Sequence, residues 1–143
     1  MMVGQFLLVG SVTAVAAGDP DGGYRGHYQD VDDRGDRGRV TFKLARNGRE
    51  IRAFRATPLA VCINPNAIGG IEVVPVPFRF DMVKVRRDGR FRKRDTVRAD
   101  PPSDATQYYE VSGRLKNGRV QNGRMVLDKR CSSSETFTAK RRP

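Results

Sequence analysis

The chain has 143 residues, with 27 Lys and Arg against 16 Asp and Glu and a formal net charge of +11. This length fits one domain that buries roughly two thirds of its unfolded surface. A single histidine and two cysteines leave a zinc or copper site without enough ligands. The charge favours anionic partners instead.

The segment from Met1 to Ala17 has the composition of a secretory signal peptide. It carries no charged side chain and ends in an Ala-x-Ala-like cleavage site after Ala16 or Ala17. The apolar run is too short for a transmembrane helix, and Gly18-Asp19-Pro20-Asp21 breaks it. We therefore expect residues 1–17 to be a removed leader and residues 18–143 to be a single β domain. The protein is expected to be secreted and to have no membrane span.

Cys62 and Cys131 are the only cysteines. An even number of cysteines in an exported chain predicts one disulfide between them, with two free thiols as the alternative. Closing so long a loop contributes about 4 kcal/mol in the chain-entropy model. No Cys-x-x-Cys motif is present, which argues against a redox-active pair.

In the first half of the mature chain, apolar and polar residues alternate as they do in short β-strands. We expect strands over 24–28, 40–44 and 51–54, with an Asn47-Gly48 hairpin turn before the third. The phase slip between Ala53 and Phe54 indicates a bulge. Further strands are expected over 59–63 and 71–76, and Pro75 and Pro77 either place the second at a sheet edge or end it there.

The second half shows the same alternation. Strands are expected over 78–85 and from Phe91 onward, on either side of an Asp88-Gly89 turn, before a loop over 100–104. A meander over 109–115 and 120–127 turns at Asn117-Gly118 and bends or bulges at Asn122-Gly123. A turn over 132–134 is expected to lead to a last strand over 137–139. About nine to ten short strands predict an all-β, single-domain antiparallel sandwich or barrel.

Short motifs follow one another along most of the mature chain. In order they are Gly22-Gly23-Tyr24-Arg25-Gly26, Val40-Thr41-Phe42, Asn47-Gly48, Cys62, Asp88-Gly89-Arg90-Phe91, Val111-Ser112-Gly113-Arg114-Leu115, Cys131 and Phe137-Thr138-Ala139-Lys140-Arg141. This series resembles small exported β-sheet domains common in high-GC Gram-positive bacteria. Those domains have no assigned activity, so the resemblance implies fold and export but no chemistry.

His27 is the only histidine and the first candidate for a catalytic base. A Ser-His-Asp triad would need Ser103, Ser112 or one of Ser132 to Ser134, and none of these lies in a Gly-x-Ser-x-Gly turn. The strand phase places His27 outward. We therefore expect no catalytic residue, no metal and no cofactor, and a protein that is not an enzyme.

One acidic cluster, Asp30, Asp32, Asp33 and Asp36, provides oxygen ligands for a hard cation. The spacing departs from the helix-loop-helix calcium pattern because Arg34 stands at a ligand position. A solvated turn is the default interpretation, and weak calcium binding stays open.

The strongest candidate binding surface is basic and surrounds the Asp88-Gly89 turn. Its residues are Arg86, Arg87, Arg90, Arg92, Lys93 and Arg94, and the cationic segment 140–142 adds to the charge. Alternate residues share a face of a strand, so Arg90, Arg92 and Arg94 are expected to form a row. Such a row suits phosphate or carboxylate groups along a polymer. The expected partner of this protein, by default a monomer, is an anionic polysaccharide, a wall polymer or another polyanion.

Other functions stay open. A small-ligand-binding barrel or minor hydrolase needs a deep apolar pocket with converging polar groups. A nucleic-acid-binding protein needs residues 1–17 in its fold and exposed rings for base stacking, for which Tyr108 and Tyr109 are candidates. Phe91 is expected in the core instead. The charge can also serve solubility alone.

Overall fold

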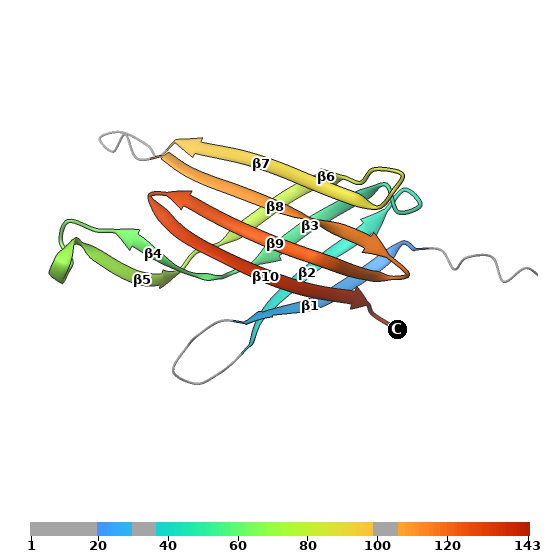
Figure 1. Ribbon diagram of the computed structural model, residues 1–143, viewed down its shortest axis with the longest axis horizontal. Coiled ribbons are helices and arrows are strands. Elements are labelled where there is room, and N and C mark those ends of the chain that lie inside the picture. The colour runs from blue at the N-terminus through green and yellow to red at the C-terminus, as the bar shows by residue number, and fades with distance from the viewer. Residues whose placement is uncertain (1–19, 30–36, 99–105) are drawn as a thin grey trace, which may run out of the picture.

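The computed structural model describes residues 20–29, 37–98 and 106–143. Within them, ten antiparallel strands confirm the all-β prediction (Figure 1). The strands are β1 (Gly22–Gln29), β2 (Arg37–Ala45), β3 (Glu50–Ala56), β4 (Leu59–Ile63), β5 (Ile71–Pro75), β6 (Phe78–Lys84), β7 (Arg90–Arg98), β8 (Thr106–Lys116), β9 (Arg119–Lys129) and β10 (Cys131–Arg141), with a 3₁₀ turn η1 (Ile68–Gly70) between β4 and β5. The expected leader, the acidic cluster and the loop over 100–104 lie outside the described residues.

Eight of these strands form a nearly closed antiparallel barrel. Hydrogen-bonded neighbours follow the order β6-β3-β2-β1-β10-β9-β8-β7, and β6 meets β7 at a bridge between Val85 and Phe91. Without β4 and β5, this order is the chain order around the barrel, so the strands run up and down and the first pairs with the last. The strand pairing therefore favours a barrel over a sandwich.

The barrel interior is filled by side chains. An eight-stranded barrel is just wide enough for this. Ring contacts with centroid separations of 4.9 to 5.9 Å link Tyr24, Phe42, Phe54, Phe78, Phe80, Phe137 and Tyr109. Phe91, Val111 and Met125 are also buried, as the alternation predicted. Fully burying one such side chain stabilises the fold by about 1.5–3 kcal/mol, so this core accounts for most of the stabilisation.

The β4–β5 hairpin is an insertion between β3 and β6. It extends beyond the barrel in Figure 1, and among the described strands β5 pairs with β4 alone. Both alternatives predicted for this proline-containing strand occur, since β5 lies at an edge and ends at Pro75. The Cys62–Cys131 disulfide, also confirmed, joins β4 to the first residue of β10 across 69 positions of sequence.

Two local predictions have different outcomes. The bulge in β3 is confirmed, because the β2–β3 register shifts there and Ala53 has φ of 51°. The turn predicted over 132–134 is wrong, since those three serines belong to β10 and pair with β4 and β9. The chain turns just before them, where Lys129 has φ of 81°.

Candidate functional site

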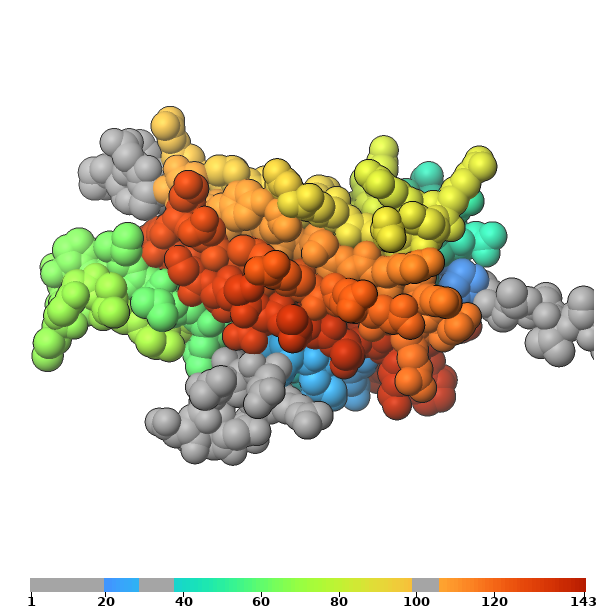
Figure 2. Space-filling model, viewed as in Figure 1, coloured from blue at the N-terminus to red at the C-terminus, as the bar shows by residue number. Residues whose placement is uncertain are grey.

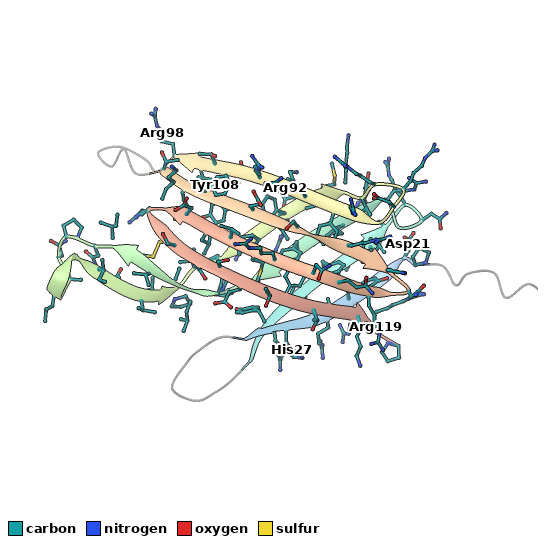
Figure 3. All side chains as sticks on the ribbon, viewed as in Figure 1. Asp21, His27, Arg92, Arg98, Tyr108 and Arg119 are labelled. Carbon is teal, nitrogen blue, oxygen red and sulfur yellow. A yellow bond between two sulfur atoms is a disulfide. The ribbon has the colours of Figure 1, made fainter. Side chains whose placement is uncertain are left out.

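The predicted row Arg90, Arg92 and Arg94 lies on the outer face of β7, and all three side chains are exposed. Its charge is partly paired. One carboxylate oxygen of Glu110 on β8 accepts a hydrogen bond from Arg92 Nη2 at 3.3 Å and lies 3.0 Å from Arg94 Nε as an ion pair. Figure 3 labels Arg92 and Tyr108 on these neighbouring strands. Asp88 lies 3.9 Å from Arg90.

Glu110 is held ionised by these neighbours. Burial on its own raises the pKa of the Glu110 carboxyl, but the Tyr108 hydroxyl and the guanidinium groups of Arg92 and Arg94 outweigh it and lower that pKa. The same hydrogen bond, which Tyr108 donates at 2.5 Å, raises the pKa of Tyr108. Tyr108 is therefore tied to a carboxylate and is poorly placed to stack on a base.

The other predicted residues of this surface lie elsewhere. Arg86 and Arg87 are exposed in the β6–β7 turn, where Gly89 N donates to Arg86 O. Lys93 points to the opposite side of β7 from Arg92, and its Nζ donates to Met82 O on β6. The structure thus brings three of the six residues into one row.

A longer basic surface crosses the other side of the barrel. Strand pairing aligns six outward-facing residues in a line across the sheet. Each of the strands β9, β10, β1, β2, β3 and β6 contributes one residue, which lies directly opposite the residue of the next strand. They are Arg119, Lys140, Arg25, Thr41, Arg55 and Arg79, here named the cationic row. Five of the six are cations, and strand spacing separates successive positions by about 5 Å.

The first three positions of the cationic row differ from the later ones in their charge balance. Within the described residues, no carboxylate lies at salt-bridge distance from Arg119, Lys140 or Arg25. Like charges directly opposite each other destabilise a sheet. Further along the row, Arg55 lies 3.6 Å from Asp81. The uncompensated charge is therefore concentrated where β9, β10 and β1 meet.

An open groove of about 810 Å³ runs over this part of the row. Its basic and titratable lining residues are Arg25, His27, Arg119, Lys140, Arg141 and Arg142, and none of its lining residues in the described chain is acidic. Figure 3 shows His27 pointing away from the barrel. We name this surface the cationic groove.

The backbone holds the two strands beneath the groove close together. A Cβ built on Gly26 of β1 would lie 1.7 Å from the Thr138 carbonyl oxygen of β10, so only glycine fits at this approach. Beyond β10, Arg142 N donates to Gly23 O at 2.8 Å. The backbone positions of Arg25 and Lys140 are therefore fixed relative to each other by the strand pairing.

Only the segment 140–142 of this groove was marked as basic by the sequence. Arg25 and Arg119 have no Lys or Arg within two residues in the sequence, and nothing local relates them to Lys140. The pairing of the first strand with the last creates the site.

His27 is exposed on β1, as its phase predicted. It lies opposite Thr138 and Arg39, whereas Ser112 and Ser132 to Ser134 pair at other positions. Among the described residues, no three His, Cys, Asp or Glu side chains are grouped to hold a metal ion. In the same part of the chain, no helix is long and apolar enough to cross a bilayer.

Two other pockets lie at the ends of the barrel. One of about 480 Å³ separates the β4–β5 hairpin from the barrel and reaches Gln107 and Tyr109. The amide of Gln107 is fully engaged, since its Nε2 lies within hydrogen-bond distance of three backbone carbonyls and its Oε1 accepts from Cys131 N. A pocket of about 380 Å³ lies among the turns at the other end, beside Arg86 and Arg87. The interior of the barrel is filled by the packed aromatic rings of the core.

No known protein family, curated protein or solved structure matches this chain. The candidate site is therefore defined by its own geometry.

Proposed function

We propose that this protein is an exported, non-enzymatic β-barrel that binds anionic polymers along the cationic row. The observation that carries the proposal is the run Arg119, Lys140 and Arg25, three cations opposite one another with no carboxylate of the described residues at salt-bridge distance. Repulsion between these cations lowers the free energy of unfolding, and a bound polyanion would remove that repulsion.

The shape of the surface suits a polymer better than a small ligand. The row crosses six neighbouring strands on the outside of the barrel, and its cations recur at steps of about 5 Å where strands are adjacent. Arg side chains can each offer two parallel hydrogen bonds to a phosphate or carboxylate. The Arg90-Arg92-Arg94 row is a second contact surface, weakened because Glu110 occupies two of its guanidinium groups.

Salt-dependent binding of two polymers tests the proposal. The probes are inorganic polyphosphate and polygalacturonate, which separate phosphate from carboxylate recognition. The triple variant Arg25→Gln, Lys140→Gln, Arg119→Gln removes three contacts, so the slope of log affinity against log salt should fall by about two to three.

The matched control is Arg90→Gln, Arg92→Gln, Arg94→Gln, which removes the same charge from β7. We expect it to change the slope by less than half as much as the groove variant. Equal losses in the two variants would mean that net charge alone drives binding. A larger loss in the β7 variant would move the binding surface to the hairpin.

Export has its own test. Intact-mass analysis of protein recovered from the culture medium should give a chain that begins after Ala16 or Ala17. A full-length N-terminus, or retention inside the cell, would contradict export. Neither result would affect the polymer-binding measurement, so the two parts of the proposal fail separately.

A further inference from the structure

Exposed apolar side chains gather on the β4–β5 hairpin. Six large apolar residues are exposed in the described part of the chain, and five of them lie here: Val61, Ile63, Ile68, Ile71 and Val73. Their exposed fractions run from 44% to 103%, the highest at Ile68 in the connection between the strands. An exposed apolar cluster of this kind marks an interaction surface in a soluble protein.

Four of the five residues share one face of the hairpin. Val61 lies directly opposite Val73, and Ile63 directly opposite Ile71, while Ile68 lies in the 3₁₀ turn at the apex and is fully exposed. Cys62 and Val74, on the other face, turn toward the barrel. In Figure 2 the hairpin projects from the body of the molecule, so the apolar apex is convex and reachable by a flat surface.

Charge is arranged around the apex but not on it. From Ala56 to Phe78 the sole charged residue is Glu72, which lies on the face that carries Cys62. Three cations lie at the same end of the barrel as the hairpin. The backbone of Arg130 links the hairpin to β8, because Arg130 O accepts from Ile63 N and Arg130 N donates to Thr106 O. Arg98 lies directly opposite Thr106, and Lys129 precedes Arg130 in the sequence. In the described chain, none of the three cations has a carboxylate at salt-bridge distance.

We propose that the β4–β5 hairpin docks on an anionic phospholipid bilayer, inserting Ile63, Ile68 and Ile71 at the boundary between headgroups and acyl chains. Apolar side chains backed by cations are the combination that binds such interfaces. A protein partner fits less well, because the hairpin has no Tyr, Trp or Arg, the side chains that dominate protein interfaces.

The depth of insertion is limited by the backbone. β5 pairs with β4 alone among the described strands, so its outer edge keeps unpaired N–H and C=O groups. Such groups cannot enter hydrocarbon without a large cost. The hairpin is therefore expected to lie in the interfacial layer, with Arg98, Lys129 and Arg130 toward the lipid phosphates.

The chain contains no tryptophan, which makes a site-specific test simple. Ile68→Trp places the fluorophore at the hairpin apex, and Gln121→Trp places it in the cationic groove. Each full-chain variant is mixed with vesicles of equal parts phosphatidylglycerol and phosphatidylcholine, or with phosphatidylcholine alone. We expect a blue shift and quenching by brominated lipid for Ile68→Trp with the anionic vesicles, and neither for Gln121→Trp.

Two sets of substitutions separate insertion from simple adsorption. Ile63→Ser with Ile71→Ser should lower vesicle affinity at least tenfold, by roughly the lost apolar burial. Arg98→Gln, Lys129→Gln and Arg130→Gln should each lower it about fivefold. The groove variant Arg25→Gln, Lys140→Gln, Arg119→Gln should keep the Ile68→Trp shift, because docking does not depend on polymer binding.

Three results would overturn the proposal. The first is no spectral change of Ile68→Trp with either vesicle while its circular dichroism is native. The second is a shift of Gln121→Trp in place of Ile68→Trp, which would assign vesicle binding to the cationic groove. The third is unchanged affinity in the serine variant, which would leave the apolar face available to another class of partner.

Discussion

Neutralising Lys140 should stabilise this protein while it weakens polymer binding. Lys140 is opposite Arg119 on one side and Arg25 on the other, so Lys140→Gln removes two repulsive cross-strand pairs. Each such pair is worth about 0.2–1 kcal/mol. We therefore expect the free energy of unfolding to rise by about 1 kcal/mol at low salt.

Urea denaturation is the appropriate assay, because urea leaves the ionic strength unchanged. With a slope of about 1–3 kcal/mol per molar urea, the midpoint should rise by roughly half a molar. The gain should shrink in 1 M salt, where the Debye length falls from about 10 Å at 0.1 M to about 3 Å. The same variant should bind polyphosphate more weakly at low salt.

Lys84→Gln is the matched control. Lys84 is also an exposed sheet lysine, but its directly opposite residue is Glu50, so its removal costs an attraction. It should leave the protein unchanged or slightly less stable. If Lys140→Gln proves no more stable than Lys84→Gln, or if its gain survives high salt, the cationic row carries no repulsion and our reasoning is wrong.

Three further predictions concern the neighbouring structure. Glu110→Gln should strengthen polymer binding by releasing Arg92 and Arg94. The folded-state pKa of Glu110 is lowered, so the ionised carboxylate stabilises the fold above the ordinary carboxyl value of 4.5, and this contribution is lost as pH falls through the lowered value. The urea midpoint of the unchanged protein should therefore fall over this acid range by more than the midpoint of Glu110→Gln. Gly26→Ala should destabilise the fold by about 3 kcal/mol and reduce polymer binding, since its Cβ meets the Thr138 carbonyl, whereas an unchanged urea midpoint would contradict that contact. Reducing the disulfide should cost about 4 kcal/mol in urea unfolding, and a cost near zero would refute the chain-entropy account.

The strands were predictable because their signals are local. Alternation fixed which face of β2 and of the meander is buried, and Asn47-Gly48 marked a turn that requires positive φ at Asn47. The failure over 132–134 has the same origin. A run of serines resembles a turn by composition, but its pairing with β4 and β9 makes it a strand, and that pairing is not local.

The cationic groove was beyond the sequence for a related reason. Arg25 and Lys140 are more than a hundred residues apart in the chain, and they meet only because β1 pairs with β10 in one register. A slip of one residue in either strand would turn the cation of that strand toward the core. The pairing of Arg92 and Arg94 with Glu110 also depends on register, so the row on β7 looked more available from sequence than it is.

Strand β10 connects the two proposed surfaces and also keeps them separable. Its first residue, Cys131, holds the β4–β5 hairpin, while its far end, at Lys140, carries the cationic row. The row end is fixed by β1 and β9 and does not need the disulfide. Mild reduction, under conditions where the barrel stays folded, should therefore weaken vesicle docking and leave the salt slope for polyphosphate unchanged. Loss of both together would mean that the disulfide sets the position of the whole strand.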